Sequence, residues 1–293
     1  MKTHELIDYI EEHKTLISDG ATGSNLQARG LDKGKAAEAW VLENPAAIQQ
    51  LHMDFLKAGA NILLTCTFGG NRFRLEHGGL ADKVQEVNRK AVEIARKAIG
   101  EQEVLLAGSM GPLGQMLKPL GLLEIEDAQQ AYGEQAKALS EAGVDFLLIE
   151  TQFDISEAQV AIRGARSVSD LAIICSFSYD RGTKTMMGIS PTRMAQGMEE
   201  FGLAALGINC GKRLDNNLTC LQELVAVTDK AVWFKPNAGL PTLDDTGNAI
   251  YSITPAEMGA QAPTWVDAGA AIIGGCCGTS PNHLAAIAAN ACQ

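Results

Sequence analysis

The 293-residue sequence lacks any apolar run near the roughly 18 residues that a membrane-spanning helix needs. It opens with MKTHELIDYIEEHK, which has neither the apolar centre of a signal peptide nor the Arg-rich, acidic-poor pattern of a transit peptide. It also lacks a basic stretch: Lys+Arg 24 against Asp+Glu 35 gives a formal charge of −11, which argues against a phosphate-backbone partner. We therefore expect a soluble, cytoplasmic protein with no membrane or nucleic-acid partner.

No linker rich in Pro, Gly or Ser and no low-complexity segment divides the chain. Hydrophobic residues make up 46% and charged residues 20%, so the chain can bury a sizeable core. The length would allow two domains of roughly 150 residues, but α/β barrels of this size routinely form one. We expect a single domain over residues 1–293.

Short apolar runs alternate with longer segments of helical period. Eight runs read as strands, beginning at Thr15, Asn61, Val104, Asp145, Leu171, Ala205, Ala231 and Ala270. Near-continuous apolar strands separated by helices indicate a parallel sheet covered on both faces. Eight units favour a closed (β/α)8 TIM barrel over an open doubly wound sheet, which would usually stop at about five or six strands. We expect the N-terminal dozen residues to form a helix that closes the bottom of the barrel.

Helix boundaries carry signals of their own. Asn44-Pro45 predicts an N-cap followed by proline at the first helical position. Ala-Gly pairs at 58–59, 142–143 and 268–269 precede strands and predict glycine C-caps.

Each predicted strand becomes polar at its C-terminal end. The residues at these ends are Asp19, Thr65 to Thr67, Ser109, Glu150, Asn209, Cys210, Asn237, Cys276 and Cys277. In a barrel these ends converge on one mouth, where the βα loops build the active site. We therefore expect one pocket that gathers residues from the whole length of the chain.

The cysteine count is odd, at seven, in a chain without an export signal, which argues against a disulfide framework. Cys276 and Cys277 are adjacent in GGCCGTS, and they can face one point only if the flanking glycines bend the backbone. Cys210 ends the sixth strand and would lie across the same mouth. Three thiolates with an open fourth position describe a catalytic zinc site. On spacing alone, a redox pair or a chance cluster remains open.

Zinc held by three cysteines favours thiol chemistry, because the ion accepts another sulfur and deprotonates a coordinated thiol. Three histidines would favour water activation instead, but the five histidines lie away from the strand ends. Glu150 follows the apolar FLLI, where a charge without a partner is costly, so we expect it to bind a ligand. The DGATG loop lacks the spacing of a phosphate or dinucleotide site.

Several motifs occur together in a family order. They are DGATGSNL (19–26), TCTFGGNR (65–72), GPLG (111–114), ETQFDISEA (150–158), GINC (207–210), KPNAG (235–239) and GGCCGTSPNHL (274–284). In combination they resemble the homocysteine S-methyltransferase family, most closely the homocysteine-binding module of cobalamin-dependent methionine synthases. The resemblance runs from about residue 12 to 290.

The resemblance implies a Zn²⁺ ion held by Cys210, Cys276 and Cys277, through which these residues act in catalysis. Homocysteine would supply the fourth, thiolate ligand and accept a methyl group to give methionine. Glu150 matches the family's contact to the substrate amino group. Asn237 matches the asparagine near the zinc and the amino acid, and Asn209 matches the one that precedes the first zinc cysteine.

The loop that begins at Asp19 is implied to hold the substrate carboxylate through its backbone, with Asp19 bracing it. Two positions depart from the family: Ser24 replaces threonine, and Cys66 replaces asparagine. Cys66 either packs as inert core or alters the pocket, so a different acceptor thiol stays open. A non-enzymatic thiol or redox module using Cys276 and Cys277 is a further alternative.

The chain ends at Gln293, soon after the eighth predicted helix, so we expect no folate or cobalamin domain. The methyl donor would then come from outside. A separate corrinoid protein carrying methylcobalamin and a small sulfonium such as S-methylmethionine are both open.

Overall fold

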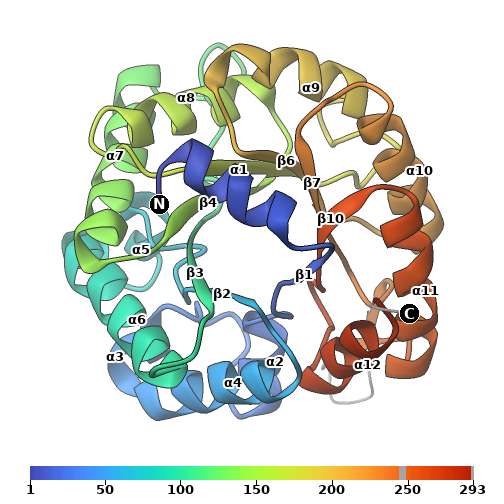
Figure 1. Cartoon of the computed structure of the whole chain (residues 1–293). Coiled ribbons are helices and arrows are strands. Elements are labelled where there is room, and N and C mark those ends of the chain that lie inside the picture. The colour runs from blue at the N-terminus through green and yellow to red at the C-terminus, as the bar shows by residue number, and fades with distance from the viewer. Residues whose placement is uncertain (244–248, 292–293) are drawn as a thin grey trace.

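The computed structural model describes residues 1–243 and 249–291, in which eight parallel strands form a barrel (Figure 1). Their order is β1-β10-β7-β6-β5-β4-β3-β2, and a bridge between Ser18 and Ile62 joins the two end strands into a ring. The strands are β1 (Leu16–Ile17), β2 (Ile62–Leu64), β3 (Leu105–Met110), β4 (Phe146–Gln152), β5 (Ile173–Phe177), β6 (Ala205–Cys210), β7 (Ala231–Pro236) and β10 (Ala270–Ile273). All eight predicted strands and the (β/α)8 fold are confirmed.

Helices follow the strands and surround the ring, except for α1, which precedes β1 (Figure 1). They are α1 (Thr3–Glu12), α2 (Gly23–Ala28), α3 (Ala39–Glu43), α4 (Pro45–Lys57), α5 (Arg72–Glu76), α6 (Val84–Ile99), α7 (Ile125–Ala142), α8 (Ile155–Arg166), α9 (Pro191–Met198), α10 (Leu214–Val225), α11 (Pro255–Asp267) and α12 (Pro281–Ala291), with 3-10 turns η1 (Ala81–Lys83) and η2 (Glu199–Phe201). None of the described helices is both long and apolar enough to cross a bilayer.

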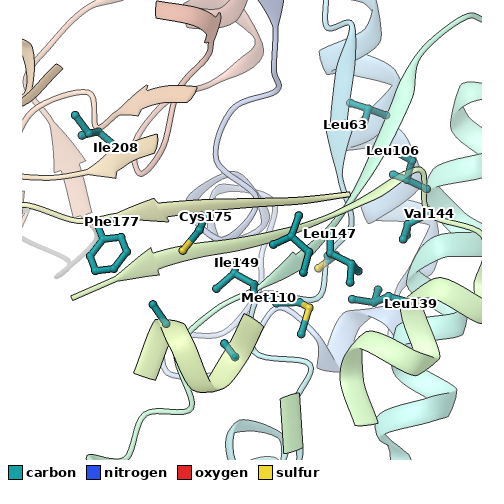
Figure 2. Packing of buried hydrophobic residues seen from close by; sticks show 14 of the residues in the cluster. Leu63, Leu106, Met110, Leu139, Val144, Leu147, Ile149, Cys175, Phe177 and Ile208 are labelled. Atoms are coloured by element: carbon teal, nitrogen blue, oxygen red, sulfur yellow. The ribbon is translucent and has the colours of Figure 1, made fainter. Parts of the chain in front are cut away.

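Side chains of the strands alternate between two apolar layers. On β4, Leu147 and Ile149 face outward and pack with residues of the surrounding helices (Figure 2). Phe146 and Leu148 face the barrel interior. Because alternation has a period of two, Glu150 continues the inward-facing row and reaches the interior at the C-terminal mouth. The fold itself therefore directs this carboxylate into the barrel.

Helix α1 crosses the opposite end of the barrel, where the strands begin (Figure 1). Its Leu6 and Ile10 are buried in the interior layer with Leu16 and Phe146. The predicted helix at the bottom of the barrel is confirmed. The eight βα loops at the other end are left to build a site.

The helix boundaries largely follow the sequence signals. Pro45 is the first residue of α4, and the glycines at 59, 143 and 269 all have positive φ, as a C-cap requires. Asn44 is the N-cap of α4, as predicted, but its side chain makes no cap hydrogen bond. Asn44 is also the C-cap of α3, where its N–H donates to the carbonyl of Trp40. Asn44 is the one residue between α3 and α4, so it caps both helices.

Helices α7 and α8 pack closely at two glycines, which yields a stability prediction. A Cβ at Gly164 would lie 2.5 Å from the Gln129 carbonyl oxygen and 3.0 Å from Tyr132 Cβ. Gly164→Ala is expected to lower the free energy of unfolding by about 1–3 kcal/mol, although alanine favours helix formation. Denaturant unfolding measures this. Gly23→Ala in α2, where no atom lies within 4 Å, is the matched control and should cost little; equal effects would contradict the packing.

Candidate metal and acceptor site

The predicted pocket lies at the C-terminal ends of the strands. A cavity of about 470 Å³ is lined by residues from seven strands or the loops that follow them. Its lining includes the 20–24 and 64–68 segments, Ser109, Glu150, Thr151, Cys210, Lys235, Gly275, Cys276 and Cys277. Its size is typical of a small-molecule site. Motifs separated by more than 250 residues thus converge as the barrel requires.

The thiols of Cys210, Cys276 and Cys277 form one cluster. Their Sγ atoms all lie within 4.8 Å of one another, and those of Cys210 and Cys276 are 2.9 Å apart. Cys277 has a lowered pKa because the other two thiols donate hydrogen bonds to its thiolate. Hydrogen bonds with Cys276 and then Cys277 raise the pKa of Cys210. Three thiols this close together could hold one metal ion, and three thiolates with an open fourth position are a ligand set that zinc accepts.

The backbone is bent where these thiols converge. Cys210 has φ +58 and Thr151 has φ +61, and no other described non-glycine residue has a positive φ. Such conformations cost about 1–3 kcal/mol and persist where the surroundings hold them. The Asn217 side chain donates to the Cys210 carbonyl at 2.6 Å, which secures the turn. This strain lies at the thiol cluster and at the residue after Glu150.

Asn209 connects the two strained residues to the sulfurs. Its Oδ1 accepts from the Thr151 N–H at 2.9 Å and from Ser176 Oγ at 2.6 Å. Its Nδ2 donates to Thr151 Oγ1 at 2.7 Å and lies 3.6 Å from Cys210 Sγ and 3.8 Å from Cys276 Sγ. Asn209 is fully buried and is not part of the cavity lining. Its geometry suits it to orient the thiols from behind.

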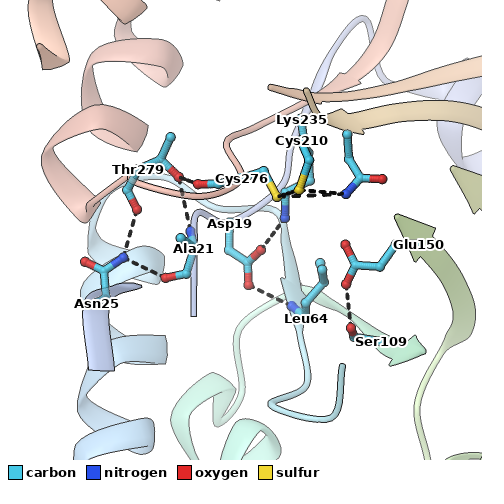
Figure 3. A network of polar contacts seen from close by, with 11 residues as sticks. Asp19, Ala21, Asn25, Leu64, Ser109, Glu150, Cys210, Lys235, Cys276 and Thr279 are labelled. Atoms are coloured by element: carbon cyan, nitrogen blue, oxygen red, sulfur yellow. Dashed lines mark hydrogen bonds and ion pairs between the residues drawn. The ribbon is translucent and has the colours of Figure 1, made fainter. Parts of the chain in front are cut away.

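Asp19 makes a buried ion pair with Lys235 (Figure 3). Its Oδ1 accepts from Lys235 Nζ at 2.8 Å, and its Oδ2 accepts from the Leu64 N–H at 2.8 Å. Its own carbonyl accepts from the Gly275 N–H at 3.2 Å. Asp19 therefore ties β1 to β2, β7 and the loop that carries two of the thiols, and it also lies outside the lining.

Glu150 lies in the cavity wall, 6% exposed, and accepts from Ser109 Oγ at 2.5 Å (Figure 3). Burial raises the pKa of Glu150 to about 7, although the positive charge of Lys235 acts in the opposite direction. Among the described residues no cation touches this carboxylate. A carboxylate in this state is suited to accept an ammonium from a ligand.

Asn237 follows β7, and its Nδ2 donates to the Gly211 carbonyl at 2.7 Å. Its Oδ1 is buried and has no partner among the described residues. Like Asn209 and Asp19 it is absent from the lining, whereas Glu150 and the three cysteines are in it. The structure thus gathers every predicted site residue in one region, four in the cavity wall and three behind it.

Three further residues belong to this region. Lys235 lines the cavity and was missed, although a charge inside the apolar AVWFKP is the signal that drew attention to Glu150. Tyr251 belongs to a hairpin of β8 (Pro241–Leu243) and β9 (Ala249–Tyr251) that was not predicted, and its ring lies over Gly278 beside Cys277. Cys66 is buried and lines the cavity. These features define a barrel with an open, thiol-rich centre that could hold a metal.

The chain matches the homocysteine S-methyltransferase family over residues 16–291 and belongs to that family. Methionine synthase of Mycobacterium tuberculosis is 30% identical over 97% of this chain and 25% of that protein, and the Mycobacterium leprae enzyme is 29% identical over 94% and 24%. The chain thus spans about a quarter of the length of these relatives. The metallated form of the homocysteine methyltransferase MmuM from Escherichia coli superimposes with a TM-score of 0.82 at 27% identity, covering 96% of this chain and 98% of that one.

Proposed function

We propose that residues 1–293 form a homocysteine-binding barrel domain that transfers a methyl group to homocysteine sulfur and so gives methionine. The observation that carries the proposal is the cluster of Cys210, Cys276 and Cys277 thiols in a cavity that also contains Glu150. Membership of the family supports the class of reaction.

We propose zinc as the metal that the three thiols would hold. A bound zinc ion would ionise a coordinated thiol and keep its sulfur nucleophilic. Asn209 would donate to the cysteine sulfurs and fix their direction, the kind of outer contact that typically strengthens a metal site about 10- to 100-fold. The cavity in front of the thiols leaves room for a fourth, substrate ligand.

Homocysteine would be gripped at two points. Its sulfur would meet the thiol cluster while its ammonium meets Glu150, both of which line the cavity. Asp19 would brace the loop that receives the carboxylate, a role consistent with its bonds to Leu64 and Lys235. Cysteine, one methylene shorter, could reach one of the two points but not both.

In the transfer step the homocysteine sulfur would attack the methyl carbon of the donor. A sulfur–carbon bond forms as the bond between the methyl group and the donor breaks, and the electron pair of that bond leaves with the donor. The thiol proton is lost on binding, so homocysteine binding should release about one proton near neutral pH.

The loops around the mouth favour a donor carried by a protein. Nine of the eleven most exposed large apolar side chains in the described part of the chain lie on these loops or at the helix start beside them; they are Phe68, Met116, Leu120, Leu122, Ile125, Met186, Leu240, Leu243 and Ile250. Exposed apolar side chains concentrated on one face mark a site of protein contact. We propose a separate methylated corrinoid protein as the donor, with S-methylmethionine as the alternative.

A donor panel on zinc-loaded protein tests the function. Homocysteine would be combined with a methylated corrinoid protein, free methylcobalamin, S-methylmethionine or betaine, and methionine would be measured. We expect the corrinoid protein to be the fastest donor, because only it can use the apolar loops. S-methylmethionine as the best donor would contradict the donor assignment alone. No methionine with any donor, together with a disulfide that forms among the three cysteines, would support a thiol or redox module instead.

A further inference from the structure

Lys235 is a buried cation inside the barrel. It lies on β7 after Trp233, and its Nζ is 5.6 Å from the centre of the Trp233 ring. The residue is only 2% exposed, yet it contributes to the lining of the cavity. Burying an ammonium is costly unless it is paired and hydrogen-bonded, so its position calls for a reason.

The ammonium uses only part of its hydrogen-bonding capacity. Nζ donates to Asp19 Oδ1 at 2.8 Å, and within residues 1–243 and 249–291 this is its one acceptor (Figure 3). A lysine ammonium has three N–H donors, so two remain for a ligand. The carboxylate of Asp19 has less capacity left to bind a ligand, because Lys235 and the Leu64 N–H each donate to one of its two oxygens.

Lys235 lies near two buried carboxylates, those of Asp19 and Glu150. Lys235 pairs with Asp19, whereas Glu150, the other carboxylate whose charge acts on Lys235, has no cation in contact among the described residues. Burial lowers the pKa of Lys235, but the carboxylates of Asp19 and Glu150 outweigh burial and raise it, so the ammonium keeps its charge. The cavity therefore presents an anion and a cation with free donors near the same thiols, which complements a zwitterion.

Resting on the proposed function, we propose that Lys235 determines acceptor specificity by binding the carboxylate of the acceptor amino acid while Glu150 binds its ammonium. The bond to Asp19 places Lys235 beside the loop that starts at Gly20. Loop amides and Lys235 would then approach the same carboxylate. The site would select a thiol that carries both charged groups over one that carries a single group.

Three thiols distinguish the Lys235 contact from the Glu150 contact. They are homocysteine, 3-mercaptopropylamine, which lacks the carboxylate, and 4-mercaptobutyrate, which lacks the ammonium. Calorimetry on the zinc-loaded full chain should show each truncated thiol binding about 10- to 150-fold more weakly than homocysteine. In Lys235→Met the preference for homocysteine over 3-mercaptopropylamine should fall to within about threefold, while the preference over 4-mercaptobutyrate persists. Glu150→Gln is the matched variant and should show the reverse pattern.

If Lys235 had a purely structural role, loss of its ion pair with Asp19 would weaken the binding of all three thiols by the same factor. That result would overturn the assignment. If Lys235→Met does not fold, Lys235→Arg can replace it; this variant keeps the charge and should keep both preferences. The wild-type protein also tests the assignment, because wild type that binds 3-mercaptopropylamine as tightly as homocysteine would contradict it. Failure of the zinc-loaded wild type to bind homocysteine at all would contradict the proposed function itself.

Discussion

Cys210→Ala is expected to remove the metal and with it the methyl transfer. Protein purified anaerobically with zinc should hold about one ion per chain, and the variant less than about a tenth of that, because two thiolates do not make a stable site. Alanine keeps the Cβ, so the backbone strain at φ +58 is the same in both proteins. Elemental analysis measures the metal, and methionine formation measures the activity.

Cys220→Ala is the matched control for this loss. Cys220 is fully buried on α10 and is not one of the three clustered cysteines. This variant should lose some stability through the smaller side chain but keep its zinc. A Cys210→Ala protein that retains a full equivalent of zinc would contradict the ligand assignment.

The barrel could be predicted because its determinants are local. Each strand is a short apolar run, each helix has its own period, and glycines with positive φ such as Gly143 and Gly269 mark the helix ends. The position of Glu150 follows from the same alternation, since it is two residues beyond the inward-facing Leu148. Chemistry at strand ends is therefore accessible from sequence once the barrel is predicted.

Pairs formed across the barrel could not be predicted in this way. Lys235 and Asp19 are 216 residues apart, and no local pattern shows that their side chains meet inside the ring. The same holds for Asn209, whose contacts with Thr151 and Ser176 place it behind the thiols instead of in the cavity wall. The β8–β9 hairpin was missed because its two strands are three residues each and largely exposed, so neither forms an apolar run of ordinary strand length.

Glu150→Gln is expected to weaken homocysteine binding about 10- to 150-fold while zinc content stays the same. The reason is that glutamine removes a charge-assisted hydrogen bond to the ammonium in a buried wall, worth about 1.5–3 kcal/mol. Glu157→Gln is the control, because Glu157 is another buried carboxylate but bonds the Leu113 N–H and the Tyr132 hydroxyl, away from the lining. Its variant should bind homocysteine like the wild type in calorimetry.

The pH dependence of this difference follows from the raised pKa of Glu150, about 7. Below that pH the carboxyl takes up a proton and has no charge for the ammonium, so the ratio of wild-type to Glu150→Gln affinity should shrink as pH falls through about 7. Homocysteine must also release its thiol proton on binding, which weakens its binding to both proteins equally at low pH, so this effect cancels in the ratio. A ratio that stays constant across this range would show that the Glu150 charge does not hold the ammonium.

Protonation of Glu150 should also make the free energy of unfolding of the metal-free protein depend on pH. The pKa of Glu150 rises from its ordinary 4.5 to about 7 on folding, so the folded state binds more protons between these values. The free energy of unfolding of the wild type should therefore decrease as pH rises from 4.5 to 7. The Glu150→Gln variant lacks this decrease, so between pH 4.5 and 7 its free energy of unfolding should rise relative to that of the wild type by up to about 3 kcal/mol. Denaturant unfolding at the two pH values measures the gain, and parallel curves would place the titration on another group.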